Sequence, residues 1–220
     1  RINAENTGID AMMYRIDDER ATVAMINAKQ RLVPIRLIVD PEMYRDPTRW
    51  QIAPHFDRLY LAGIPMKITD HQGINHGKLA MLKGQGMTIF GSSNWTKPSA
   101  NSQHENNLFT TQTLIWDYFE QFFARRWDNT SPTGAVETAP FVPKPPDKPA
   151  INSPANAAVG VGTAGVRLRW NPGLWGQYYD IYFGTSPNPP LFVQNQFVGY
   201  GTPTAPTLSF TLPTLSPGTT

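Results

Sequence analysis

The sequence has no cysteine among its 220 residues. Disulfide bridges and zinc sites built on cysteine are therefore excluded. It also lacks an apolar run near the roughly 20 residues that a membrane-spanning helix needs, so we expect no transmembrane segment. The chain begins at Arg1 with neither an initiator methionine nor a signal peptide. We therefore expect a piece of a longer protein, in which any export signal would lie upstream.

A strong charge of either sign is missing as well. The formal net charge is +2, from 19 Lys and Arg against 17 Asp and Glu, and this balance disfavours a broad nucleic-acid surface, which usually shows clustered cations. Residues 1–130 hold 15 of the 19 basic and 14 of the 17 acidic residues, whereas residues 131–220 are nearly uncharged. This shift predicts two domains, 1–130 and 150–220, joined by a semi-rigid, proline-rich linker over residues 131–149.

Strand and helix patterns alternate along the first of these domains. Short apolar runs predict strands over residues 9–14, 34–39, 66–69, 87–90 and 107–110, and a further strand is expected to contain His76 and Lys78. Periodic apolar positions predict helices over residues 17–30, 50–62 and 114–127. Residues 41–49 are expected to form a loop. This alternation is typical of an α/β fold with a mixed, mostly buried sheet.

The last predicted helix of this domain is rich in aromatic side chains. They are Trp116, Tyr118, Phe119, Phe122, Phe123 and Trp127. We expect them to pack against the sheet, as large apolar residues on one face of a helix normally do. A membrane-facing patch is the alternative interpretation.

Two pairs of polar residues flank a predicted glycine-rich turn. His76 and Lys78 are two residues apart, so both side chains leave the same face of an extended segment. Ser92 and Asn94 have the same spacing after the next apolar run. A tight turn at residues 84–86 would bring both pairs to one end of the sheet. A nucleophile, a cation and two neutral hydrogen-bond donors in one place are suited to a phosphate ester.

Each of these residues has a role in this hypothesis. His76 would attack phosphorus, Lys78 would hold a non-bridging oxygen, and Ser92 and Asn94 would donate hydrogen bonds to the same phosphate. Glu105 would accept a hydrogen bond from the other ring nitrogen of His76 and fix its tautomer. In the alternative interpretation Ser92 and Asn94 are turn residues and Glu105 is a surface charge.

The segments His76-Gly77-Lys78, Gly91-Ser92-Ser93-Asn94 and Glu105-Asn106-Asn107 resemble the phospholipase D superfamily, whose motif is H-x-K-x4-D followed by G-S/G-x-N. The likeness extends over about residues 5–128. It implies a phospholipase D-like α/β/α sandwich. It also implies a phosphodiesterase that acts through a phosphohistidine intermediate, with no metal or other cofactor. The substrate that it implies is a phospholipid or a nucleic-acid strand.

Two departures from the family pattern stand in this sequence. Lys83 occupies the position of the motif aspartate, so the alternative function is a catalytically inactive domain that retains the fold. Only one H-x-K is present, whereas the family's active site uses two, with one His as nucleophile and the other as general acid. His55, His71 and His104 lack that setting. We therefore expect the second motif from an upstream half, which would make this domain the C-terminal half of the enzyme, or from a second subunit.

The C-terminal region resembles a fibronectin type III domain. Residues 168–170 resemble its second strand and residues 178–183 its third, both with alternating apolar positions. Residues 215–220 resemble the turn that precedes a later strand. The last strands of such a sandwich would be absent, so we expect a truncated domain with open edges. A sandwich module on a proline-rich tether suits a secreted enzyme, or, if the site is inactive, an adhesive module that binds a surface.

Overall fold

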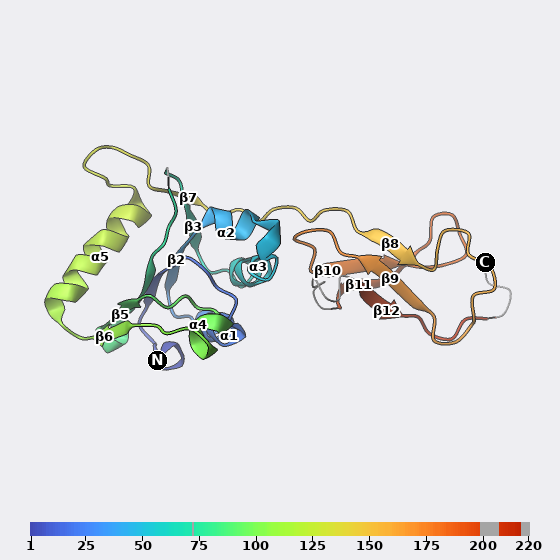
Figure 1. Cartoon of the computed structure of the whole chain (residues 1–220), viewed down its shortest axis with the longest axis horizontal. Helices are drawn as coiled ribbons and strands as arrows, with labels where there is room; N and C mark the ends of the chain where they lie inside the picture. The colour runs from blue at the N-terminus through green and yellow to red at the C-terminus, as the bar shows by residue number, and fades with distance from the viewer. Residues whose placement is uncertain (72, 199–206, 217–220) are drawn as a thin grey trace. The chain divides into compact units, whose positions relative to one another are not determined.

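The computed structural model describes residues 1–71, 73–198 and 207–216. The chain forms two compact units, Arg1–Pro143 and Lys144–Thr220 (Figure 1). The boundary between them falls within the stretch for which the sequence predicts a linker. The first unit carries the predicted site.

A seven-stranded mixed sheet forms the centre of the first unit, in the order β6-β5-β4-β1-β2-β3-β7. The strands are β1 (Ile9–Met13), β2 (Ile35–Val39), β3 (Met66–Thr69), β4 (Lys78–Leu82), β5 (Met87–Gly91), β6 (Asn107–Thr110) and β7 (Thr138–Pro140). β1, β2 and β3 run parallel, and the other pairings are antiparallel. The predicted mixed α/β sheet is confirmed.

Helices cover both faces of this sheet (Figure 1). On one side lie α1 (Glu19–Gln30), α2 (Pro41–Arg45) and α3 (Ala53–Leu61), and on the other lies α5 (Thr113–Asp128); the short α4 (Lys97–Asn101) follows β5. Five of the six aromatic residues that were expected to pack on the sheet do so, whereas Tyr118 is 62% exposed. Phe123 is fully buried in a cluster with Met12, Ile38 and Met81, and four further aromatic residues of this helix pack against that cluster. The predicted core role of this helix is confirmed.

The segment after β2 differs from the expected loop. Residues 41–45 form α2, and a 3-10 helix follows at Pro47–Arg49. Asp40 begins α2, since its side chain accepts hydrogen bonds from the backbone N–H groups of Glu42 (2.9 Å) and Met43 (3.1 Å). Pro41 stands at the first helical position, where its missing N–H costs no hydrogen bond. These start signals are local, and the sequence analysis missed them.

Part of the predicted linker belongs to the sheet. Residues 138–140 form β7, an edge strand that pairs antiparallel with β3. Just beyond it, the ring of Phe141 is buried and lies edge-on to Tyr44, with ring centroids 4.9 Å apart. The first unit therefore extends past residue 130, because its sheet and its aromatic core are completed by residues that the proline content had assigned to a linker.

The second unit contains only strands and loops among its described residues. β12 (Leu208–Thr211), β9 (Arg167–Asn171) and β8 (Ala150–Ser153) form one sheet, and β10 (Tyr178–Tyr182) pairs with β11 (Leu191–Phe197) in another. Trp170 and Ile181 are buried, and the rings of Trp170 and Tyr179 lie 5.2 Å apart. The fibronectin type III likeness stays a prediction, and residues 217–220 of its expected turn lie outside the described residues.

Candidate active site

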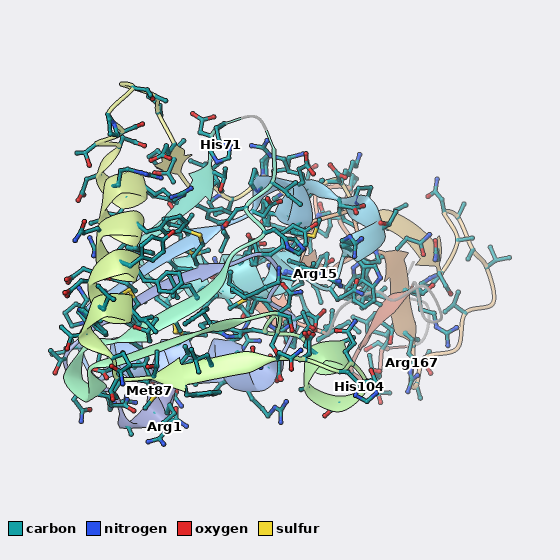
Figure 2. All side chains as sticks on the ribbon, turned by 60° about the vertical axis from the view of Figure 1, so that its left-hand side comes forward. Arg1, Arg15, His71, Met87, His104 and Arg167 are labelled. Atoms are coloured by element: carbon teal, nitrogen blue, oxygen red, sulfur yellow. The ribbon has the colours of Figure 1, made fainter. Side chains whose placement is uncertain are left out.

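The predicted polar residues lie at one end of the first unit's sheet. β1 ends next to the beginning of β4, where Met13 pairs with Lys78. β5 runs antiparallel to β4, so the end of β5 lies at the same place. Figure 2 shows Arg15, just after β1, and Met87, at the beginning of β5, toward opposite ends of the strands. The topology therefore brings both polar pairs to one end of the sheet.

His76 lies on a short loop that precedes β4, and its side chain is exposed. Asp40 fixes this loop, because its Oδ2 accepts a hydrogen bond from the Asn75 N–H (2.7 Å), and the Asn75 side chain accepts one from the Gly77 N–H (3.2 Å). The Tyr14 ring packs against the imidazole, with centroids 4.7 Å apart. The hydrogen bonds fix the loop, and the exposed imidazole ring of His76 is accessible to a substrate.

Burial and charge both act on the protonation of His76. Partial desolvation lowers its pKa from the ordinary value of 6.5, the charge of Lys78 lowers this pKa further, and Asp40 opposes them. A lowered pKa keeps the imidazole neutral at neutral pH, which is the form able to attack an electrophile.

Lys78 is the most enclosed of the predicted site residues, with 8% of its surface exposed. Its Nζ donates a hydrogen bond to the His76 carbonyl (2.7 Å) and lies 5.0 Å from the centre of the Tyr14 ring. Desolvation lowers its pKa, Glu105 opposes this, and Arg15 lowers the pKa further. A partly buried ammonium group without an ion-pair carboxylate among the described residues favours a bound anion.

Glu105 has a different partner from the one predicted. The Ser92 hydroxyl donates a hydrogen bond to its carboxylate, and this bond is the largest cause of the lowered pKa of Glu105. Among the described residues no hydrogen bond joins Glu105 to His76, and Asp40 is the acid whose charge acts on the imidazole. The predicted orientation of His76 by Glu105 is therefore absent from this structure, in which Glu105 accepts a hydrogen bond from Ser92 instead.

Three buried polar atoms near the site lack a hydrogen-bond partner among the described residues. They are Oδ1 of Asn94, Nε of Arg15 and Nδ2 of Asn75. Asn94 and Arg15 are linked through the backbone, since the Trp95 N–H donates to the Arg15 carbonyl (3.1 Å). Buried polar atoms normally have partners, so this pair is suited to a polar ligand. The sequence analysis missed Arg15, although its place directly after a parallel strand was a usable signal.

Lys83, the residue at the motif aspartate position, lies away from the site. It follows β4 at the end remote from Lys78, roughly 16 Å away for five residues of strand. Its Nζ lies 3.0 Å from Oδ2 of Asp10, a carboxylate that is 2% exposed and also accepts two hydrogen bonds of 2.7 Å from Arg36. Lys83 therefore belongs to a structural ion-pair cluster.

No second histidine joins the site among the described residues. His55 bonds Thr22 through Nδ1 (2.8 Å) on the α1 and α3 side of the sheet, and burial lowers its pKa. His71 follows β3 and His104 follows α4 (Figure 2). Across residues 1–71, 73–198 and 207–216, the structure has no group of three or more His, Asp or Glu side chains that could hold a metal ion. In the same residues, no helix is long and apolar enough to cross a membrane.

Comparison with known proteins gives a consistent result for the first unit. Residues 1–127 match the family described as "Cardiolipin synthase, PLD-like domain". The chain is 31% identical over 109 residues to a mitochondrial cardiolipin hydrolase of Xenopus laevis. The aligned region covers 50% of this chain and 49% of that protein. It is 29% identical over 121 residues to a phospholipase D of Rickettsia typhi, covering 53% of this chain and 55% of that protein. The chain thus spans about half the length of the curated relatives it matches.

Solved structures share the fold at low sequence identity. Nuc from Salmonella typhimurium, a phospholipase D family member, has a TM-score of 0.54 and 19% identity, covering 64% of this chain and 85% of its own. NucT from Helicobacter pylori has a TM-score of 0.52 and 16% identity, covering 64% and 86%. The expected assignment to a C-terminal half is not supported: the matching domain is N-terminal in this chain, and it covers most of the Nuc fold by itself.

Proposed function

We propose that this chain, which belongs to the cardiolipin synthase, PLD-like domain family, is one catalytic unit of a phospholipase D-type phosphodiesterase. The imidazole of His76 attacks phosphorus, a P–N bond forms, and the alcohol leaves with a proton from a general acid. Water then attacks the phosphohistidine, the P–N bond breaks, and the imidazole is restored. The substrate is a phospholipid or a nucleic-acid phosphodiester.

The observation that carries this proposal is the setting of Lys78. A buried ammonium group, an exposed neutral imidazole and an unpartnered guanidinium nitrogen at one sheet end offer both charge and hydrogen bonds to a phosphate. Ser92 and Asn94 lie on the adjoining segment. The side-chain amide of Asn94 would donate to the same phosphate, and the Ser92 hydroxyl, which donates to Glu105 in this structure, would have to exchange that acceptor for a phosphate oxygen. We assign Glu105 to positioning Ser92, which is its partner in the structure.

The general acid must come from outside the described site, because no second histidine adjoins His76 there. We propose that a second domain of this kind supplies it, either as a second copy of this chain or as another part of a longer protein. A second copy predicts that activity per chain rises with protein concentration until the dimer is saturated. Activity per chain that stays constant under dilution to nanomolar protein would argue against a second copy.

The test is turnover of bis-p-nitrophenyl phosphate, phosphatidylcholine and single-stranded DNA by the wild-type chain and by His76→Asn. We expect the variant to lose at least about 10³-fold in rate, because the covalent step needs the imidazole. His71→Asn is the matched control and should retain the wild-type rate. Acid-quenched reactions should contain phosphohistidine only when His76 is present. Equal turnover by wild type and His76→Asn would rule out the assignment.

The second candidate function is binding without catalysis, and the substitution at Lys83 is the observation that favours it. Lys83 lies far from His76 and pairs with Asp10, so its presence is a weaker argument for an inactive site. An inactive domain would bind phosphodiesters and give no phosphohistidine. We further propose that the second unit is a fibronectin type III-like surface-binding module of a secreted protein, which cell fractionation and binding of residues 144–220 to surface glycans would test.

A further inference from the structure

A cavity of about 210 Å³ opens next to Lys78, in the part of the first unit where β4, β5 and β6 lie side by side. Its walls are mainly apolar and include Met13, Ala80, Ile89, Trp95 and Phe109, with Lys78 at its border. We call this cavity the Trp95–Phe109 slot. Because Lys78 lines both the slot and the phosphate site, a molecule held at Lys78 by its phosphate can extend into the slot.

The strand register explains the apolar floor of the slot. Ala80 pairs with Ile89, and Ile89 pairs with Phe109, so these three side chains form one row across the sheet. Leu79, the neighbour of Ala80, packs in the cluster beneath α5. Side chains alternate along a strand, so the Ala80 row lies on the sheet face opposite α5.

The aromatic wall of the slot is open to solvent. Phe109 is 56% exposed although it lies in a strand. The strand that carries it, β6, is an edge of the sheet. Large exposed apolar side chains next to a cavity are a common mark of a ligand site.

Apart from Lys78, the polar side chains that line the slot are Ser93 and Asn107, and they are hydrogen-bonded to each other. Asn107 Nδ2 donates to the Ser93 hydroxyl (2.7 Å), and the Ser93 N–H donates to Asn107 Oδ1 (3.3 Å). A nucleobase carries donors and acceptors around its edge, and burying them without partners is costly. An alkyl segment has no such groups and gains free energy from burial. The slot therefore fits a hydrocarbon segment better than a base.

We propose that the Trp95–Phe109 slot binds a short alkyl or acyl segment of the phosphodiester whose phosphate lies at Lys78, and that Ile89, Trp95 and Phe109 determine this specificity. The inference rests on the proposed function for the position of the phosphate. The volume is below the ~300–1,000 Å³ of pockets that enclose a whole ligand, so the slot takes only the part of the chain nearest the phosphate.

The test compares binding of methylphosphonate and hexylphosphonate to the full chain by NMR, which requires no turnover. We expect hexylphosphonate to bind at least about tenfold more tightly, because several methylene groups become buried. Ile89→Trp, which fills the slot, should abolish this preference and leave methylphosphonate affinity unchanged. Phe109→Ser, on the exposed edge, should reduce the preference without filling the slot. Tyr118→Ser, an exposed aromatic change on α5, is the matched control and should preserve it.

The outcomes separate the slot from the phosphate site. Equal affinities of the wild-type chain for the two phosphonates would overturn the proposal that the slot binds an alkyl segment. A preference for hexylphosphonate that survives Ile89→Trp would do the same. Neither result would affect the proposed phosphate site. Absence of binding by both phosphonates would overturn the phosphate site and the slot together. In turnover of short-chain phosphatidylcholine, Ile89→Trp should show the same loss as a raised KM.

Discussion

The protonation of His76 depends on burial and on two neighbouring charges, and each acts on its pKa in a known direction. Burial and Lys78 lower its pKa below 6.5, and Asp40 raises it. The neutral, nucleophilic form therefore persists to lower pH than in a free histidine, and the acid limb of the rate–pH profile should lie below 6.5. Protonation at lower pH removes the lone pair that attacks phosphorus.

Substitution of Lys78 should move this titration in a defined direction. We expect Lys78→Met to raise the pKa of His76 toward its ordinary value, since a neighbouring positive charge is removed while burial remains. An NMR pH titration of the His76 ring measures this directly. Lys97→Met is the control, because Lys97 is not among the groups that act on His76. An unchanged titration in Lys78→Met would contradict the geometry described for the pair.

Lys83 should matter for stability and not for the site. Lys83→Met should lower the free energy of unfolding by about 1 kcal/mol, because the lysine is partly exposed and Asp10 keeps Arg36. Asp10→Asn should cost about 3 kcal/mol, since it leaves two cations near a buried position without a carboxylate. Urea denaturation measures both. The His76 ring signals should be the same in Lys83→Met and wild type, and a changed signal would place Lys83 in the site after all.

At the scale of elements, two glycines allow the close packing of the strand ends at the site. A Cβ on Gly91 would lie 2.1 Å from the Asn106 carbonyl oxygen, which accepts the Ser92 N–H hydrogen bond (2.9 Å). A Cβ on Gly77 would lie 2.7 Å from the Met12 sulfur. A side chain can rotate away, whereas a paired backbone cannot. The two glycines therefore have different tolerance to substitution.

Gly91→Ala should be the more damaging of the two changes. We expect it to lower the free energy of unfolding by about 2–3 kcal/mol and to separate the beginning of β6 from the end of β5. Gly77→Ala should cost about 1 kcal/mol, because Met12 adapts. Urea denaturation gives the stabilities, and amide hydrogen exchange of Ser92 reports the opening of the β5–β6 end. Similar costs for the two variants would show that the backbone contact at Gly91 is not limiting.

At the scale of the molecule, the first unit should end after Phe141 and not at residue 130. Asn129 Oδ1 accepts hydrogen bonds from the N–H groups of Glu137 and Thr138, each at 2.9 Å, which fixes the approach to β7. A chain of residues 1–143 should therefore unfold cooperatively with the same midpoint as the first unit in the full chain. A chain of residues 1–130 loses β7 and the buried Phe141 ring, and should be less stable by at least about 3 kcal/mol. Equal urea midpoints for the chains of residues 1–143 and 1–130 would show that the first domain ends at residue 130.

The sequence by itself determined the features that depend on local spacing. The strand and helix alternation follows from apolar periodicity over a few residues, and the mixed sheet and the core role of the aromatic helix followed from it. The spacing of the polar pairs was likewise sufficient to place Lys78 at the beginning of β4 and Ser92 and Asn94 just after β5. His76 lies on the loop before β4 and not within the strand, as the sequence had led us to expect. The turn between β4 and β5 then set both pairs at the same end of the sheet.

Only the tertiary structure decided the contacts between residues far apart in the chain. The charge of Asp40 raises the pKa of His76, the Ser92 hydroxyl donates a hydrogen bond to Glu105, and Asp10 forms an ion pair with Lys83. The two residues of each pair are separated by at least 13 residues in the chain. β7 pairs with the distant β3, and the Trp95–Phe109 slot likewise brings together residues that are far apart in the chain, such as Met13 and Phe109. Periodicity carries no information on such pairings, because they depend on strand order and register, which are fixed by packing of the whole sheet.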